Sequence, residues 1–384
     1  MLIADLPTPA LLVDRVRLEA NLAAMQARAA EEGVALRPHA KTHKSAEVAR
    51  RQVAGGAEGL TVATIAEAEA FAAAGFSDVL LASPVAGRDR LARAAALVGQ
   101  GVRLAFTVDT RAGAEAASAV FAAHGLVAEV RLEVDTGHAR NGLRHDDPEA
   151  PALARHIAGL PGLRMAGVLT HGGHVYAGPR EGEAPAEALE RVAAEERDRL
   201  LRLAARLGEA GVLRPGEASV SLGSTPTLSV FRNRTGGGFR VTEVRPGNYV
   251  FHDAQQVALG AASLRQCALT LVATVLSRQR AADGTERLVI DAGKKALGMD
   301  TGWGVRGFGT LLYSRRTMRP APHGRLVRLS EEHGVVEVPG GAVQRVGDPV
   351  MLVPNHACVA VALHRRLHLA EGDEVTETWD VLAR

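Results

Sequence analysis

Residues 102–134 read VRLAFTVDTRAGAEAASAVFAAHGLVAEVRLEV, in which a helical run separates two β-type runs. The flanking segments, 102–108 and 128–134, are rich in Val and Leu. Between them, the apolar residues of 112–124 recur at the spacing of one helix face. A connection of this length joins parallel strands, because antiparallel neighbours need only a short turn. The stretch therefore predicts a βαβ unit.

The same alternation extends over most of the first 251 residues, and segments 63–74 and 185–207 are further amphipathic helices. The β-type runs that alternate with such helices lie at 34–38, 60–64, 79–82, 102–108, 128–134, 164–170, 219–222 and 243–251. Repeated βα units cover both faces of a parallel sheet. Eight of them predict a (β/α)₈ TIM-type barrel more than an open doubly wound sheet.

After residue 255 the pattern changes to short β-type runs joined by Gly- and Pro-rich turns, with no long helical pattern between them. We expect strands at 268–277, 288–290, 335–338, 349–353 and 357–363. The run at 10–14 would exceed the eight barrel strands, so we assign it to the same β region. The chain is thus predicted to be an α/β protein with a barrel over residues 15–255. A second, mostly β C-terminal domain is expected over 256–384, and it also takes residues 1–14.

Composition narrows the class of protein. Hydrophobic residues make up 47% of the 384 and charged residues 23%, which is ordinary for a globular enzyme. A net charge of +2, with no basic run interleaved with aromatics, gives no support for a nucleic-acid partner. We expect neither a secretory signal nor a membrane span, because no long uninterrupted apolar run occurs. Two cysteines provide no disulfide framework, so we expect a cytoplasmic protein.

Lysine is rare in this chain: only four of the 45 basic residues are lysines, and they form the pairs Lys41 with Lys44 and Lys294 with Lys295. Arginine supplies nearly every other cation, so a retained lysine is a candidate for chemistry that arginine cannot perform. Condensation with an aldehyde to a Schiff base is such chemistry, because it needs an amine that loses its proton. Lys41 follows the first expected barrel strand and is our predicted reactive residue. The alternative is that compositional bias left a few lysines at random.

Two neighbouring strand ends carry glycine together with polar residues. Gly223, Ser224 and Thr225 follow the seventh expected strand, and Gly247 and Asn248 lie at the eighth. Glycines let backbone N–H groups approach an anion, hydroxyls add donors, and these two loops are the usual phosphate site of such a barrel. Ordinary turns use the same residues, which is the alternative. A lysine that captures aldehydes beside a phosphate site predicts pyridoxal phosphate as cofactor.

Further candidates follow the fifth and sixth expected strands. Arg140 would hydrogen-bond the phenolate oxygen of the cofactor or a substrate carboxylate, with a surface salt bridge as the alternative. His174 and Tyr176 lie in the run Thr170-His171-Gly172-Gly173-His174-Val175-Tyr176. We take both as candidate catalytic residues and Tyr176 also as a cofactor contact, whereas packing at the barrel rim is the alternative for Tyr176.

The β region offers a candidate metal site in Pro354-Asn355-His356-Ala357-Cys358. On a strand, residues two apart face the same side, so His356 and Cys358 could hold one cation together. Imidazole plus thiolate suits zinc, and two protein ligands would leave positions open for water and substrate. A buried cysteine beside a hydrogen-bonded histidine is the alternative.

Four of these segments, together with two others, resemble the D-serine dehydratase and D-threonine aldolase family. Members of that family are fold-type III enzymes with an alanine-racemase-like barrel. The resemblance extends in order from about Pro7 to Trp379. It rests on Pro38-His39-Ala40-Lys41-Thr42-His43-Lys44, Gly223-Ser224-Thr225-Pro226, Arg245-Pro246-Gly247-Asn248-Tyr249, Asp291-Ala292-Gly293-Lys294-Lys295, Glu332-His333-Gly334 and Pro354-Asn355-His356-Ala357-Cys358.

The resemblance implies a role for each segment. Lys41 is implied as the cofactor lysine, and His356 and Cys358 as ligands of a divalent metal, zinc or manganese. The implied cofactor contacts at the last two barrel strands are Gly223, Ser224, Thr225, Gly247, Asn248 and the adjoining Tyr249. The resemblance also implies a homodimer with its sites near the interface.

The implied activity is that of a lyase acting on D-3-hydroxy amino acids. The Gly-Ser-Thr-Pro loop, Asn248-Tyr249 and the cysteine at the second metal position resemble the dehydratases, which give a 2-oxo acid and ammonia. The runner-up is a D-threonine aldolase, which would give glycine and an aldehyde, with His174 or a metal-bound water as base. A third alternative, a pyridoxal phosphate carrier without strong catalytic activity, would consist of the barrel alone and leaves the β domain unexplained.

Overall fold

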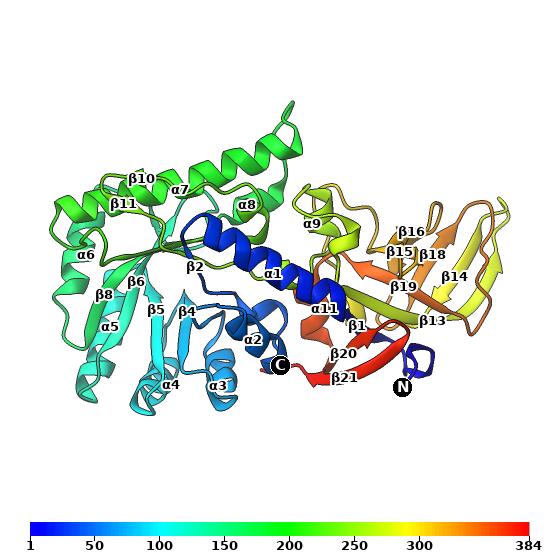
Figure 1. Ribbon diagram of the computed structural model, residues 1–384, viewed down its shortest axis with the longest axis horizontal. Helices are drawn as coiled ribbons and strands as arrows, with labels where there is room; N and C mark the ends of the chain where they lie inside the picture. Colours follow the sequence, from blue (N-terminus) through cyan, green and yellow to red (C-terminus); the bar gives the residue numbers. More distant parts are fainter. Residues whose placement is uncertain (384) are drawn as a thin grey trace.

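The structure is a computed structural model that describes residues 1–383, and it has two parts (Figure 1). The barrel and its helices, drawn in blue to green, occupy one end of the molecule, and the yellow-to-red strands occupy the other. Helix α1 (Arg15–Glu31) lies against strands of both parts, since it contacts β2 (Ala35–Leu36) of the barrel and β20 (Arg366–Glu371) of the β part.

The predicted barrel is confirmed. Its eight parallel strands run in the spatial order β2-β12-β9-β8-β6-β5-β4-β3. The ring closes between β2 and β3, where Thr61 N donates to Pro38 O at 2.8 Å and His39 pairs with Thr61 in a parallel bridge. After β2, the strands in chain order are β3 (Leu60–Val62), β4 (Asp78–Pro84), β5 (Arg103–Val108), β6 (Ala128–Asp135), β8 (Leu163–Thr170), β9 (Ser219–Leu222) and β12 (Glu243–Val244), with the short β7 (Leu143–Arg144) added to β6.

The barrel helices begin where the sequence supplies a cap. Thr64, before α3, accepts from Glu67 N at 3.2 Å, and Glu67 Oε2 accepts in return from Ala63 N at 2.7 Å. Such reciprocal capping satisfies backbone donors that the first helical turn leaves free. The helices are α2 (Ala46–Ala54), α3 (Ile65–Ala73), α4 (Arg88–Gly99), α5 (Arg111–Ala123), α6 (Ala150–Ala158), α7 (Pro185–Glu209) and α8 (Thr225–Leu228).

The inside of the barrel is polar at its centre. Glu243 is buried and accepts from Arg37 Nε at 2.6 Å and from Arg131 Nη1 at 2.6 Å. Its remaining partner is the hydroxyl of Ser221, at 2.5 Å. Apolar packing lies outside the strands instead, where Phe106 of β5 stacks on Phe121 of α5 with ring centroids 5.7 Å apart. The buried charges are therefore paired, as burial of charge requires.

The β part is built on a mixed sheet that takes the N-terminal strand, as predicted. Strand β1 (Ala10–Asp14) pairs antiparallel with β13 (Leu269–Arg280) and parallel with β20. The other strands are β14 (Glu286–Ile290), β15 (Gly309–Ser314), β16 (Arg319–Pro320), β17 (Arg325–Leu329), β18 (Gly334–Val338), β19 (Pro349–Pro354) and β21 (Glu374–Asp380).

Two expected strands are wrong, one in type and the other in length. Residues 357–363 form helix α11 (Ala357–Leu363) instead of a strand. A short apolar run fits a helix or a strand equally well, and the Ala-rich ACVAVAL segment forms the helix. The expected strand 243–251 is a strand only at Glu243–Val244, because Pro246 cannot donate to a ladder. One turn of 3₁₀ helix, η4 (Asn248–Val250), follows.

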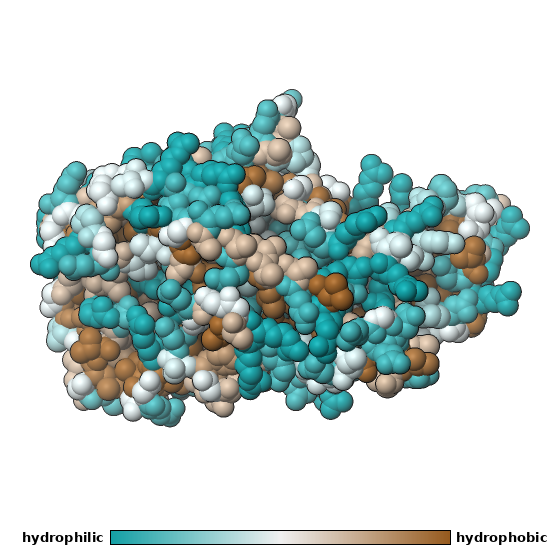
Figure 2. Space-filling model, viewed as in Figure 1, coloured by the Kyte–Doolittle hydropathy of each residue, from teal (hydrophilic) through white to brown (hydrophobic). Residues whose placement is uncertain are grey.

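The remaining elements are short. They comprise the helical turns η1 (Ile3–Asp5), η2 (Ala40–Thr42), η3 (Gly173–Ala177), α9 (Ala254–Ala258), η5 (Leu264–Gln266) and α10 (Lys294–Leu297), and the hairpin β10 (Thr235–Gly236) with β11 (Phe239–Arg240). On the face shown in Figure 2, hydrophilic side chains predominate and the apolar ones are scattered. Within residues 1–383 there is no helix with the length and apolar character that a membrane span needs.

Candidate active site

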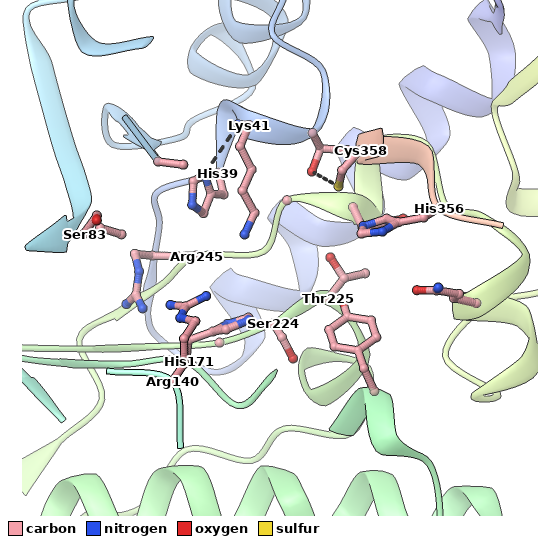
Figure 3. Close-up of a pocket in the computed structure, with 18 of the residues that line it drawn as sticks. His39, Lys41, Ser83, Arg140, His171, Ser224, Thr225, Arg245, His356 and Cys358 are labelled. Atoms are coloured by element: carbon pink, nitrogen blue, oxygen red, sulfur yellow. Dashed lines mark hydrogen bonds between the residues drawn. The ribbon is translucent and has the colours of Figure 1, made fainter. Parts of the chain in front are cut away.

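A cavity of about 610 Å³ opens at the carboxyl ends of the barrel strands, where this fold places its chemistry. Figure 3 shows its polar side chains converging from both parts of the molecule. Barrel loops contribute the basic residues, and the β part contributes a carboxylate, an imidazole and a thiol. The polar lining includes His39, Lys41, Arg140, His171, Tyr176, Ser224, Thr225, Arg245, Asn248, Asp300, His356 and Cys358.

Lys41 lies on the single turn η2 directly after β2, and its side chain points into the cavity (Figure 3). The turn is capped by His39, whose Nδ1 accepts from Lys41 N at 3.4 Å. Burial lowers the pKa of the Lys41 amine, Cys358 opposes that shift, and the positive charge of Arg140 adds to it. A lowered pKa increases the fraction of neutral amine, which is the form that attacks an aldehyde.

An anion site lies at the ends of β9 and β12. The backbone N–H groups of Thr225, Gly247 and Asn248 donate to no other group in the described part of the chain. The Ser224 and Thr225 hydroxyls lie in the same cavity wall. A Cβ on Gly247 would stand 2.7 Å from Thr42 Oγ1, so only glycine permits this close approach. Free N–H groups at two helix starts fit the phosphate of the expected cofactor.

Glu196 of α7 fixes the loops that border this anion site. Its carboxylate is buried and accepts from Gly172 N at 2.6 Å and from Gly223 N at 3.0 Å. Thr227 Oγ1 donates to the same carboxylate at 3.1 Å. The sequence analysis missed Glu196, because one glutamate within a long amphipathic helix carries no signal that its side chain faces the barrel mouth.

Arg245 is a second residue that the sequence analysis missed. It is buried, lines the cavity, and donates to Thr170 O at 2.5 Å and to the Ser221 hydroxyl. Burial lowers its pKa to about 10, so the guanidinium stays charged at neutral pH. The sequence did contain a signal that Arg245 faces the inside of the barrel: it stands two positions after Glu243, and residues two apart on a strand face the same side.

The candidate metal ligands lie on the β side of the cavity (Figure 3). His356 follows β19 and caps α11, and Cys358 is in the first turn of α11. His356 Nδ1 contacts Asp300 Oδ2 at 2.5 Å, and Thr42 Oγ1 lies 3.2 Å from Cys358 Sγ. The predicted pair therefore does share one cavity, although a helix start and not a strand brings the two residues together.

The ionisation of Cys358 suits a metal site, whereas His356 must release a proton before its imidazole can bind a metal. Burial alone would raise the pKa of Cys358, but the hydrogen bond and charge of His356 lower it. Burial alone would lower the pKa of His356, but Cys358, Asp253 and Asp300 raise it to about 10. The thiolate is the form of cysteine that binds metals. No third His, Cys, Asp or Glu in residues 1–383 completes a ligand set with the pair, so a bound zinc ion would retain open positions.

Arg140 and Tyr176, both predicted, line the cavity. Arg140 forms only a long ion pair with Glu133, whose Oε1 is 3.8 Å from Arg140 Nη2. Its charge is therefore available to an anionic ligand. The Tyr176 hydroxyl accepts from Gln256 Nε2 at 3.2 Å, and burial raises its pKa, so it keeps a proton to donate.

Two predicted side chains do not line the cavity. The Tyr249 hydroxyl accepts from Gln52 Nε2 of α2 at 3.0 Å, on the other side of the strand end, and only its backbone N–H contacts Thr225. The His174 imidazole is directed at α7, with Nε2 3.4 Å from Glu195 Oε2. His171, three residues earlier, lines the cavity instead, and burial lowers its pKa well below the usual range.

The fold and this cavity define an alanine racemase-like barrel protein with a buried lysine beside a candidate anion site. Comparison with known proteins is consistent with that class. The profile described as "Alanine racemase, N-terminal domain" matches residues 13–255, and the one described as "Putative serine dehydratase domain" matches residues 268–370.

The chain is 37% identical to the D-threo-3-hydroxyaspartate dehydratase of Delftia sp. (strain HT23), over 98% of this chain and 97% of the relative. It is 33% identical to a D-threonine aldolase of Arthrobacter sp, over 100% of this chain and 94% of that relative. The solved structure of the Delftia sp. HT23 dehydratase superimposes with a TM-score of 0.88 at 36% identity, covering 99% of each chain. The chain therefore belongs to the family of fold-type III pyridoxal phosphate lyases that contains these dehydratases and aldolases.

Two further solved structures of that dehydratase are alanine variants, one of a histidine and one of a cysteine two positions later, and the cysteine variant is in a metal-free form. The spacing of those two residues equals that of His356 and Cys358.

Proposed function

We propose that this chain is a pyridoxal phosphate- and divalent-metal-dependent lyase that eliminates the β-hydroxyl of a D-3-hydroxy amino acid. The products are a 2-oxo acid and ammonia, as for a D-serine dehydratase. The observation that carries the proposal is the shared cavity: the amine of Lys41, the free N–H groups of the anion site and the His356–Cys358 pair all line it. A non-catalytic carrier would have no use for a thiolate and an imidazole beside the reactive amine.

The barrel, residues 15–255, would bind pyridoxal phosphate. Lys41 would hold the cofactor through Nζ, and the phosphate would lie against the N–H groups of Thr225, Gly247 and Asn248 with the Ser224 hydroxyl beside them. Gly223 adopts φ +116°, a conformation that few other residues reach, and this turns the loop so that Ser224 faces the cavity.

The β domain, residues 1–14 and 256–384, would supply the metal site. The donor set of His356 and Cys358 fits zinc better than manganese, because thiolate is a soft ligand. The histidine and cysteine variants of the Delftia dehydratase support the assignment, since the cysteine variant is metal-free. Asp300, held against His356 Nδ1, would orient that imidazole toward the metal.

The chain's own residues have distinct tasks in the reaction. Bound in this cavity, pyridoxal phosphate supplies an electron sink for charge at the α-carbon, and the divalent cation supplies a Lewis acid for the β-hydroxyl. The neutral Lys41 amine takes the α-proton of the substrate at Nζ. Arg140 binds an anionic oxygen of the substrate or of the cofactor. Tyr176 donates its hydroxyl proton into the cavity as a hydrogen bond.

Carbon–carbon cleavage is the second candidate function, and the 33% identity to a D-threonine aldolase favours it. Cleavage requires a base that removes the proton of the β-hydroxyl. His174 does not line the cavity, and the imidazole that does is that of His171. Elimination is preferred because Cys358 and the higher identity to a dehydratase both favour it.

We also infer a homodimeric cytoplasmic protein with no nucleic-acid partner.

Product analysis tests the proposal. Protein reconstituted with pyridoxal phosphate and zinc, or manganese, is incubated with D-serine, D-threonine and D-threo-3-hydroxyaspartate, and with the L-isomers as controls. We expect a 2-oxo acid and ammonia in equal amounts from at least one D-substrate, and no product from Lys41→Ala. Glycine plus an aldehyde would establish the aldolase instead, and no turnover of any D-substrate would overturn both functions.

A further inference from the structure

A single buried carboxylate connects the anion site to the candidate metal pair. Asp253 is 0% exposed and begins α9, where the chain leaves the barrel for the β part. Its Oδ2 accepts from Asn248 Nδ2 at 2.5 Å and from Ala357 N at 2.8 Å. Its Oδ1 caps α9 by accepting from Gln256 N at 3.0 Å. Both carboxylate oxygens are thus used, and one of them bridges two segments 109 positions apart, Asn248 and Ala357.

Each of the two residues that donate to Asp253 Oδ2 adjoins one of the two candidate sites. The backbone N–H of Asn248 is one of the free donors of the anion site. Ala357 lies between His356 and Cys358 in the sequence, so its backbone position sets the separation of their side chains. A displacement at either partner therefore reaches the other through one oxygen atom.

The orientation of Asn248 depends on this bond. Asn248 is buried, and its Oδ1 has no hydrogen-bond partner in the part of the chain that the structure describes. Among residues 1–383, the bond from Nδ2 to Asp253 is the only side-chain hydrogen bond that fixes the amide. Hydrogen bonds to a charged acceptor are about twice as strong as neutral ones, so the bond is able to transmit a constraint.

The first turn of α9 strengthens the same junction. Gln255 N donates to Asn355 O at 3.2 Å, directly before His356 in the sequence. Gln256 Nε2 donates to the Tyr176 hydroxyl at 3.2 Å. Residues 253–256 consequently contact the anion site, the metal segment and a cavity tyrosine within one helical turn.

We propose that Asp253 is a positioning residue that couples the two sites. Pyridoxal phosphate in the anion site then tightens metal binding, and a bound metal tightens the binding of pyridoxal phosphate. This rests on the proposed function, because it assumes that both groups bind. Fixing Asn248 by a phosphate fixes Asp253, which in turn holds Ala357 and the two metal ligands in one arrangement. Linkage requires the same factor in both directions.

The matched substitution is Asp253→Asn. Asparagine is isosteric and is as good an N-cap as aspartate, so Oδ1 continues to cap α9. The second oxygen becomes an NH₂ group, which only donates and therefore accepts from neither Asn248 nor Ala357. Thr110→Ala is the control: it removes the cap of α5, where Thr110 Oγ1 accepts from Gly113 N at 3.2 Å, on a helix that takes no part in the site.

The experiment measures affinities and not turnover. The dissociation constant of pyridoxal phosphate is determined from its visible absorbance with and without saturating zinc, and that of zinc by competition with a chelating dye with and without pyridoxal phosphate. For the wild-type chain and for Thr110→Ala we expect each ligand to tighten the other about five- to tenfold, within the usual range of coupled sites. For Asp253→Asn we expect both ligands to bind and the factor to fall toward one.

Each other outcome has a definite meaning. If both ligands bind the wild-type chain independently, the coupling is overturned and the proposed function stands. If neither binds, the proposed function itself fails. If the factor is unchanged in Asp253→Asn, the ligands interact directly through their charges and Asp253 has no part in it.

Should Asp253→Asn fail to fold, Asn248→Ala provides the second variant. It removes only the amide partner and leaves both the α9 cap and the bond to Ala357 N in place. We expect zinc still to bind Asn248→Ala in the absence of pyridoxal phosphate, and we expect the cofactor to confer no gain in zinc affinity on this variant. A retained gain would overturn the proposal.

Discussion

The ε-ammonium of Lys44, which is half-buried, lies 2.9 Å from Oε1 of the buried Glu67, beside the turn that carries Lys41. Lys44 also adopts φ +46°, and its Nζ donates to Ala383 O at 3.1 Å. Its carbonyl oxygen accepts from Leu382 N at 2.6 Å. One lysine thus connects the turn η2, the start of α3 and residues 382–383 near the C-terminal end.

Replacing Lys44 by methionine should destabilise the fold strongly. Methionine keeps the length of the side chain but leaves the Glu67 carboxylate buried without its charge partner, which costs about 3–5 kcal/mol in comparable pairs. Urea unfolding of Lys44→Met measures the loss. Lys295→Met is the matched control, because Lys295 pairs with Glu332 at 2.8 Å in an exposed position and its removal should change stability little. Equal losses in the two variants would contradict the prediction.

The buried charges at the barrel centre predict a pH-dependent stability. Burial alone would raise the pKa of Glu243, but Arg131 and Arg37 outweigh it and lower the pKa far below the ordinary value. Since the unfolded chain then binds the proton more tightly, this stabilisation is present above about pH 4.3, the usual pKa of glutamate, and is lost as the pH falls below it. Glu243→Gln removes the charge.

We expect Glu243→Gln to be less stable than the wild type by about 3 kcal/mol at pH 7, because Arg37 and Arg131 lose their shared partner. The difference in the free energy of unfolding between the two proteins should narrow at pH 3.5, where the wild type itself begins to lose the stabilisation from the Glu243 charge. Urea unfolding at the two pH values tests this. The exposed Glu337, which pairs with Arg287 at 3.3 Å, provides Glu337→Gln as control, with no such pH dependence. A difference that stays constant with pH would rule out the assignment.

The shifted pKa of Lys41 predicts how cofactor capture depends on pH. Burial lowers the pKa of the amine and Arg140 adds to the shift, while Cys358 opposes it. The neutral form therefore persists to lower pH than for a free lysine, whose pKa is about 10.4. The rate at which apo protein captures pyridoxal phosphate, followed by absorbance, should be half-maximal below that pH. Lys41→Arg should show no capture, and a wild-type midpoint equal to that of a free lysine derivative would contradict the prediction.

The barrel was predictable from sequence because it rests on a repeated signal. Each βα unit repeats the same alternation of β-type and helical runs. Errors of a few residues at single boundaries therefore do not alter the number of predicted barrel strands. The β part gives shorter and less regular signals. There the run 357–363 was misassigned, because seven apolar or small residues have no period that separates a strand from a helix.

The site was predictable where its residues stand at strand ends and not elsewhere. Lys41, Arg140 and Ser224 line the cavity because they follow barrel strands that end at one edge, and the His356–Cys358 pair follows β19 of the β part. Asp253 is at the start of a helix, Glu196 is inside a helix, and Asp300 is in a loop. Only tertiary packing brings these three side chains to the site. His174 was predicted to act in the site for want of such a signal: it lies in the 3₁₀ turn η3 and faces α7, whereas His171, just before that turn, lines the cavity.

Metal removal distinguishes a lyase from a carrier. Treating the reconstituted protein with a chelator should lower turnover by at least about 100-fold, because Lewis-acid assistance contributes several kcal/mol to such reactions. The visible absorbance of bound pyridoxal phosphate should remain, provided the cofactor is supplied well above its dissociation constant. Cys358→Ala should bind little zinc and behave like chelated protein. Cys267→Ala is the matched control, since Cys267 is a buried free cysteine that does not line the cavity, and it should retain zinc and turnover. Full activity in the chelated wild type, with zinc content shown to be negligible, would remove the metal from the mechanism.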